Sequence, residues 1–344
     1  MKKRFLMLAI TVLVATLLMI PGCGGEKAPA GGGGEMELFS LLPDNAVGVF
    51  SLNLKKLAQL DFFDKMIKEA EQKETKKPGE LFENYQDFVD KTGIDPKKDI
   101  HGMAFGLYGQ LGAKEPDTVF LANLNYTQGP LLTIIKGKAP GYTEETYNGV
   151  TVHKFKDEKG KDMALSFLSD NIIAAGRPDL LMKVIDNHQG KGQGITANET
   201  MKPHFNKIKS GAIATFVFGF PQEAKKVHDS GMFKLDLTKA EAIVGYIDNA
   251  DKTWTAEITM ISPDEEANQQ LVSTLNGLKM MAAAGGPEVE EVVKNLDLKA
   301  SADGVKLKVT MTEELMEKLR TKMAGKMAPP PPTQTPETPE PEED

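Results

Sequence analysis

Cysteine, histidine and arginine, which often provide reactive groups or bind anions, are scarce in this chain of 344 residues. It has one cysteine, Cys23, one tryptophan, Trp254, and five histidines. With a single cysteine no disulfide can form within the chain, so the fold must be held by its core. Only Arg4, Arg177 and Arg320 are arginines. Because bidentate clamps on phosphates and carboxylates use arginine, the sequence does not favour dedicated anion recognition.

The first 22 residues have the pattern of an export signal. A basic start at Lys2, Lys3 and Arg4 leads into an apolar run, 5–20, that only two threonines interrupt. A membrane-spanning helix needs about 20 apolar residues, and this run instead meets a proline and a glycine-rich stretch. The pattern predicts a cleaved signal peptide over 1–22.

The residues Ile20-Pro21-Gly22-Cys23 resemble the lipobox of bacterial lipoproteins. The resemblance implies that the Cys23 thiol receives a diacylglycerol, that cleavage precedes Cys23, and that the new amine is acylated. Pro21 departs from the commoner small residue at its position. Acyl chains such as palmitate, at about 0.8 kcal/mol per buried CH2, would then hold the protein on a membrane. The alternative is ordinary cleavage that leaves Cys23 as a free thiol.

The charge of the chain bears on its partners. The formal net charge is −8, and loss of the signal peptide makes it −11. An acidic protein does not attract phosphate backbones, so we expect no nucleic-acid partner. The expected location is outside the cytoplasm, with the protein lipid-anchored to the bacterial cell envelope, either at the outer membrane on its periplasmic face or on the outer face of the cell membrane.

Composition divides the chain after the signal peptide into five parts. A glycine-rich segment and a proline- and glutamate-rich tail have nothing to bury, whereas the middle alternates apolar and polar residues. The expected parts are a lipid-anchored flexible linker, 23–37; a first α+β half, 38–189; a joint, 190–204; a second α+β half, 205–325; and a disordered tail, 326–344.

The patterning of both halves predicts an α+β fold with mostly antiparallel sheets and helices packed on one face. Asn148-Gly149 and Asp303-Gly304 each mark a hairpin between alternating segments. Laid over each other, the halves share the order β-α-β-β-α followed by a hairpin and a helix, with the first half carrying additional strands at 163–175. We interpret this order as two diverged copies of one unit. The alternative is one α+β domain with repetitive patterning.

Three stretches resemble exported bacterial domains of unknown function. They are an opening Leu42-Pro43-Asp44-Asn45, a hairpin Tyr147-Asn148-Gly149-Val150, and the strand 170–176 that follows. The resemblance covers most of the mature chain and implies no active site.

No motif for catalysis, a cofactor or a metal is present. The sequence lacks a phosphate-loop signature, a nucleophile elbow and a His-Glu-x-x-His pair. Gly190 to Gly194 is predicted to be a linker, and His153 an ordinary surface residue of a hairpin. The acidic clusters at 157–158, Asp162 and 248–251 are expected in solvated turns, although calcium could bind such oxygens. We therefore predict a protein that is not an enzyme and has no cofactor.

Methionine is the one enriched residue, at 17 in the whole chain. Its side chain adapts to irregular apolar surfaces, either as core filler or in a pocket. The leading functional hypothesis is a lipid-anchored, non-catalytic binding or scaffold protein of the envelope, with an envelope protein as a possible partner. The alternatives are a carrier of a lipid or other apolar ligand, and a hydrolase with an unrecognised site.

Overall fold

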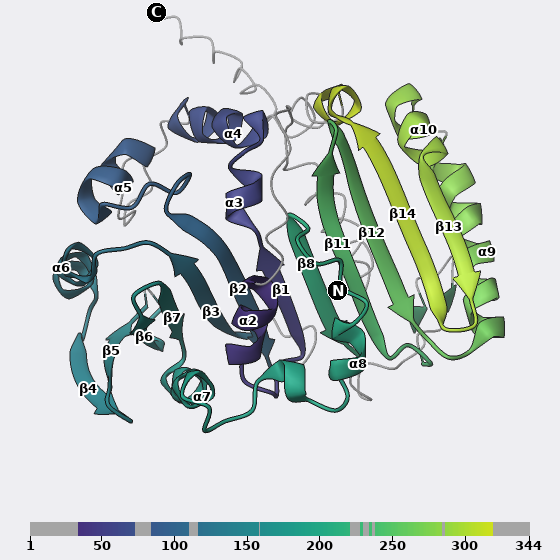
Figure 1. Ribbon diagram of the computed structural model, residues 1–344. Helices are drawn as coiled ribbons and strands as arrows, with labels where there is room; N and C mark the ends of the chain where they lie inside the picture. The colour runs from purple at the N-terminus through teal and green to yellow at the C-terminus, as the bar shows by residue number, and fades with distance from the viewer. Residues whose placement is uncertain are drawn as a thin grey trace, which may run out of the picture.

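A computed structural model shows one large antiparallel sheet with helices around it (Figure 1). It describes residues 34–72, 84–109, 116–157, 159–220, 228–229, 234–235, 238–283 and 286–318. Twelve strands form the sheet in the order β13-β14-β12-β11-β8-β1-β2-β3-β7-β6-β5-β4. The α+β class and the antiparallel pairing expected from the sequence are confirmed.

The strands of the first half are β1 (Gly48–Leu52), β2 (Ile100–Tyr108), β3 (Asp117–Leu124), β4 (Thr143–Tyr147), β5 (Val150–Lys156), β6 (Asp162–Ser169) and β7 (Ile172–Gly176). Those of the second half are β8 (Ala214–Gly219), β11 (Ala242–Ala250), β12 (Thr253–Ile261), β13 (Leu296–Ser301) and β14 (Gly304–Thr312). A separate ribbon pairs β9 (His228–Asp229) with β10 (Lys234–Leu235).

The helices in chain order are α2 (Gly34–Leu41), α3 (Leu54–Leu57), α4 (Asp61–Gln72), α5 (Tyr85–Thr92), α6 (Gln128–Lys138), α7 (Pro178–His188), α8 (Lys202–Phe205), α9 (Glu265–Ala283) and α10 (Pro287–Lys294), with a 3-10 turn η1 (Ile195–Ala197). In the described part of the chain, no helix is both long and apolar enough to cross a bilayer.

The two halves meet at the centre of the sheet, where β1 pairs with β8. Outward from this pair, each half places its first three strands side by side. A helix then leads to a hairpin whose last strand returns beside the third, which is β7 in one half and β14 in the other. By position, β13–β14 therefore corresponds to β6–β7. The overlay of the two halves in sequence matched the hairpin at 148–149 with the one at 303–304, and left 163–175 as the additional strands of the first half. That assignment is wrong, because the additional strands are β4 and β5.

Helices cover both faces of the sheet, where the sequence pattern had indicated one. We name the two sides the α2 face and the phenylalanine face. On the α2 face, Val49 and Leu121 join the core formed with α2 and α7. On the phenylalanine face, Phe50 and Ala122 pack in clusters with α3, α5 and α6. Central strands such as β3 are apolar on both sides, so both sides need cover.

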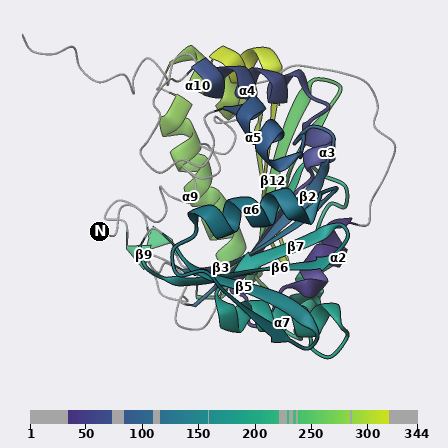
Figure 2. The ribbon, with the colours of Figure 1, turned by 90° about the vertical axis from the view of Figure 1, so that its left-hand side faces the viewer.

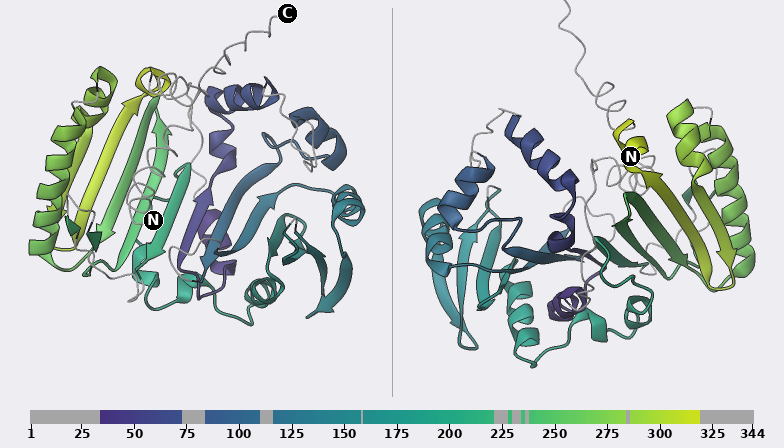
Figure 3. Two further views of the ribbon diagram at one scale, coloured as in Figure 1. Left: turned by 180° about the vertical axis from the view of Figure 1, so that it is seen from behind. Right: turned by 45° about the horizontal axis from the view of Figure 1, so that its top comes forward.

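The ends of the sheet show this layering directly. In Figure 2, α6 and α7 lie on opposite sides of the strands β3, β5, β6 and β7. In Figure 3, α9 runs alongside β13 and β14 at the other end. The segment 190–204, expected as a joint, contributes buried side chains to the core beneath α2, among them Ile195 and Met201.

Candidate functional site

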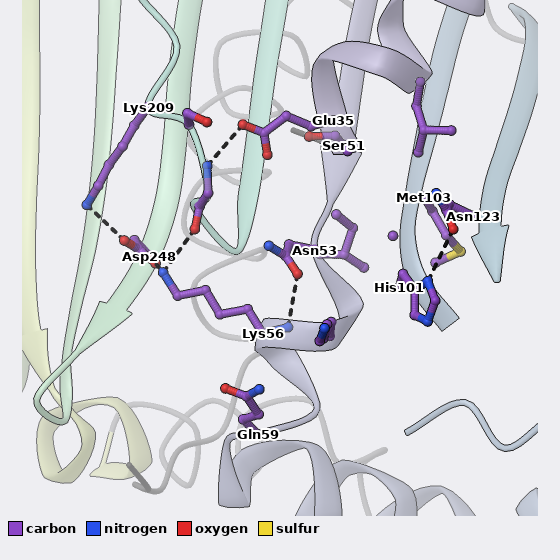
Figure 4. A pocket seen from close by; sticks show the side chains of 17 residues that line it. Glu35, Ser51, Asn53, Lys56, Gln59, His101, Met103, Asn123, Lys209 and Asp248 are labelled. Carbon is purple, nitrogen blue, oxygen red and sulfur yellow. Dashed lines mark hydrogen bonds and ion pairs between the residues drawn. The ribbon is translucent and has the colours of Figure 1, made fainter. Parts of the chain in front are cut away.

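A polar cleft opens on the α2 face where the two halves join (Figure 4). Its volume is about 780 Å3. Six parts of the chain line it: the start of α2, the segment 51–59 from the end of β1 through α3, the start of β2, Asn123 of β3, the loop 209–211, and β11. Because the sheet is continuous beneath it, the cleft has a fixed floor.

A buried carboxylate lies at the centre of one wall of the cleft. Asp248 has a side chain that is 8% exposed, and both of its oxygens are paired. Lys56 Nζ lies 2.5 Å from Oδ1 and Lys209 Nζ lies 2.8 Å from Oδ2. Lys56 also donates to the carbonyl oxygen of Gly211 at 3.0 Å. Since Lys56 follows β1 and Asp248 lies on β11, this pairing links the two halves.

Asp248 does not lie in a solvated turn, contrary to the prediction from sequence. Strand β11 continues through Ala250, which is paired with Thr253 of β12. The turn comes later, at Asp251 and Lys252, whose φ angles are 49° and 62°. The ladder therefore holds Asp248 inside the sheet, at a position that only the register reveals.

Glu35 is a second acidic group, half-buried at the edge of the cleft. Its Oε1 accepts a hydrogen bond from the backbone N–H of Gly211 at 3.0 Å. Burial raises the pKa of this carboxyl, while hydrogen bonds from Gly211 and Ser210 and the charge of Lys56 oppose the rise. The net direction is upward, so the protein favours the neutral form of Glu35 more than water does.

Most of the remaining polar groups in the cleft can donate hydrogen bonds. His101 Nδ1 lies 3.2 Å from Asn123 Oδ1 on the neighbouring strand. The Asn53 side chain caps α3 by accepting from Lys56 N at 3.0 Å, which leaves its amide NH2 available. Lys55, Gln59 and Ser210 also line the cleft. This arrangement suits a polar ligand rich in oxygen.

A row of phenylalanines crosses the opposite side of the sheet. In the strand register, Phe216, Phe50, Phe105 and Phe120 lie directly opposite one another across β8, β1, β2 and β3. Ring centroids are 6.1 Å apart for Phe50 and Phe105 and 5.2 Å for Phe105 and Phe120. All four side chains are partly exposed. This row gives the phenylalanine face its name.

Two glycines make room for the rings at the β8 end of this face. A Cβ on Gly245 would lie 2.4 Å from Cζ of Phe216, and a Cβ on Gly48 would lie 2.2 Å from Cδ1 of Phe218. Both rings therefore lie flat against the backbone of the neighbouring strand. Sequence reasoning missed the row because its members are scattered along the chain and only the register brings them together.

His153 is buried, contrary to the surface position predicted for it. Its residue is 2% exposed, between Tyr142 and Phe167. Nδ1 lies 2.8 Å from the Tyr142 hydroxyl, which in turn bonds to Glu144, while Nε2 has no hydrogen-bond partner. Burial lowers the pKa of His153, because the imidazolium would lose hydration. Strand β5 turns Val152 toward the core with α7 and turns His153 to the other face, where Tyr142 and Phe167 cover it.

Cys23, the one site residue predicted from sequence, lies outside the described residues. Within the described residues, no group of three or more histidine, aspartate or glutamate side chains is arranged to hold a metal ion. Among the described methionines, some fill the core, as the sequence allowed, and others lie on an exposed helix surface. Met201, Met311 and Met316 are buried in the core, whereas Met280 and Met281 on α9 are 78% and 58% exposed.

Comparisons with known proteins give only distant likenesses. No family model matches the chain, and no curated protein matches it. Three solved structures are similar, described as crystal forms III, I and IV of TP0453. They share 10%, 8% and 9% sequence identity, with TM-scores of 0.47, 0.45 and 0.45. The matches cover 86%, 83% and 82% of this chain and 100%, 97% and 96% of the others. At this level no function is transferred from them.

Proposed function

We propose that this protein is a lipid-anchored, exported, non-catalytic binding protein of the bacterial envelope, and that the cleft on the α2 face holds a polar ligand. The observation that carries the proposal is the position of α2. Its first residues, Gly34 and Glu35, line the cleft. Cys23 is eleven residues before Gly34, so the two lie within about 40 Å of each other in any conformation. An acylated Cys23 keeps the cleft close to the membrane surface.

The character of the cleft supports binding. Its donors and charged groups come from segments far apart in sequence and are positioned by strands and short helices. Sites that bind polar ligands have such a small set of convergent polar groups in a concave surface. The ion pairs of Asp248 also fix the wall, which limits the entropy lost when a ligand is held.

The anchor is tested by metabolic labelling with palmitate in cells that express the full chain. We expect label on the wild-type protein and on a control, Ala28→Ser, which alters the same segment without removing the thiol. Cys23→Ser should carry no label and should move from the membrane fraction to the soluble fraction. Label absent from the wild type, or Cys23→Ser still sedimenting with membranes, contradicts the anchor.

A second candidate function is the binding of a lipid or other apolar molecule, and the phenylalanine face favours it. The four rings of this row are partly exposed and lie opposite one another across the strands, so together they offer apolar contact to an acyl chain or ring system. A contiguous set of partly exposed apolar side chains can mark a site of apolar contact.

This second function is tested by native mass spectrometry of Cys23→Ser protein purified without detergent. We expect a bound apolar molecule, lost on Phe105→Ser and retained on Phe155→Ser, which changes a partly exposed ring outside the row. Protein of unmodified mass in the Cys23→Ser sample with the row intact excludes apolar carriage.

A further inference from the structure

We propose that the ligand of the cleft carries a phosphate group, which Lys55, Lys56 and Lys209 hold. This inference rests on the proposed function, because it names the ligand class for the same cleft. It follows from the charges, the donors and the position of the site, which are taken in turn.

The charges in the cleft do not cancel. Asp248 shares its two oxygens between Lys56 and Lys209, so this trio retains one positive charge. Among the described residues, Lys55 has no ion-pair partner, and its side chain is exposed at the cleft. Glu35 is the remaining carboxylate. The cleft is therefore cationic by one charge when Glu35 is ionised and by two when it is neutral, within a chain whose net charge is −8.

The donors exceed the acceptors. Lys56 uses two of its three protons, on Asp248 and Gly211, and Lys209 uses one on Asp248. The third proton of Lys56 and two of Lys209, whose Nζ also lies 4.8 Å from the centre of the Tyr246 ring, remain for hydrogen bonds, with those of Lys55 and the amides of Asn53 and Gln59. A phosphate accepts several hydrogen bonds at once and carries the complementary charge, so it matches this surplus.

A phosphate site built from lysine is compatible with the scarcity of arginine in the sequence. Scarce arginine argued against bidentate clamping, but lysine binds phosphate as a point charge without fork geometry. Apolar side chains beside the lysines, Leu38, Leu52 and Met103, extend the cleft. The geometry suits a phosphate ester with an apolar or sugar-like part more than inorganic phosphate.

A phosphate ester could reach the cleft from two sources: a soluble molecule or the headgroup of a membrane phospholipid. The short connection from Cys23 to Gly34 would bring the cleft to the membrane surface, where anionic headgroups are concentrated. Both sources share the same recognition chemistry. They are distinguished experimentally by offering the phosphate either on a soluble molecule or on the surface of a vesicle.

The experiment uses the full mature chain with Cys23→Ser, so that failure of the anchor does not affect it. Glycerol 3-phosphate is titrated by calorimetry. In parallel, co-sedimentation is measured with vesicles of phosphatidylcholine alone or mixed equally with phosphatidylglycerol. The test variant is Lys55→Gln/Lys209→Gln. The control is Lys138→Gln/Lys183→Gln, which removes the same charge from exposed positions on α6 and α7. Lys55→Gln alone is included because it leaves Asp248 fully paired.

We expect the test variant to lose at least tenfold in affinity, Lys55→Gln to lose severalfold, and the control to match the wild type. Binding of glycerol 3-phosphate with this pattern supports a soluble ester. The same pattern only with phosphatidylglycerol vesicles supports a lipid headgroup. The proposal is overturned if neither probe binds, if both vesicle types bind equally, or if test and control variants weaken alike.

Discussion

Gly48→Ala is expected to destabilise the protein by displacing one aromatic ring. The new Cβ would lie 2.2 Å and 2.4 Å from two atoms of the Phe218 ring, distances that no relaxed structure holds. No backbone atom is among these contacts, so the ring alone must move. Swinging it into solvent forfeits part of the 1.5–3 kcal/mol or so that full burial of a phenylalanine contributes. Because Phe218 is already partly exposed, we expect a cost of about 1–2 kcal/mol.

The assay is urea unfolding followed by the emission of Trp254, the sole tryptophan, which is fully buried. Gly277→Ala is the matched control: it lies inside α9 with nothing within 4 Å of its Cβ, so it should stabilise by about 0.5–1 kcal/mol. Phe218→Leu should interact with Gly48→Ala, and the double variant should be more stable than the sum of the single effects. Additive effects, or a Gly48→Ala protein as stable as the wild type, would refute the flat-ring geometry.

Three further predictions concern charged and titratable groups. Burial lowers the pKa of His153 from its ordinary 6.5, so the unfolded chain takes up a proton first and stability falls as pH drops below about 6.5. His153→Gln should lose less stability between pH 7.5 and 5.5 in urea titrations; His204, also buried with a lowered pKa, is unchanged in both proteins, and equal losses would contradict the assignment. Asp248→Ala should cost about 1–2 kcal/mol, a value reduced by the partial exposure of its lysine partners. Asp297→Ala, which removes an exposed pair, should cost much less, and similar costs for the two variants would contradict the buried pairing. For Glu35 the pKa is raised above 4.5, so its contribution to stability is present below that pH and is lost as pH rises through the folded value. Glu35→Gln should therefore gain stability relative to the wild type from pH 4 to pH 7 in thermal melts, and a constant difference would contradict the raised pKa.

Local sequence patterns predicted individual helices, strands and turns better than they predicted which of these elements lie side by side. Asn148-Gly149 predicted a hairpin, and these residues join β4 to β5 with φ angles of 49° and 81°. Asp303-Gly304 predicted another, and it lies at the turn between β13 and β14. Such features depend on residues close in sequence, which a single chain displays directly.

The candidate site could not be predicted in the same way. Asp248 and Lys56 are 192 residues apart and meet only because β1 and β11 flank β8. His153 lies in an alternating hairpin, where polar residues ordinarily face water, and only the packing of Tyr142 and Phe167 against it explains its burial. Cross-strand register and the placement of helices on both faces are long-range properties that patterns of period two or 3.6 do not encode.

The pairing of β1 with β8 has a consequence for how a ligand enters. Proteins that trap ligands between two lobes close like a clamshell, with bending confined to thin connections. Here the floor between the halves is an unbroken ladder, with Gly48 to Leu52 paired residue by residue to Phe218 to Ala214. Bending there would rupture main-chain hydrogen bonds at the middle of a twelve-stranded sheet. We therefore expect ligand entry and release to depend on side-chain rotation and on the first turn of α2. Ligand selectivity should depend on the fixed shape of the cleft.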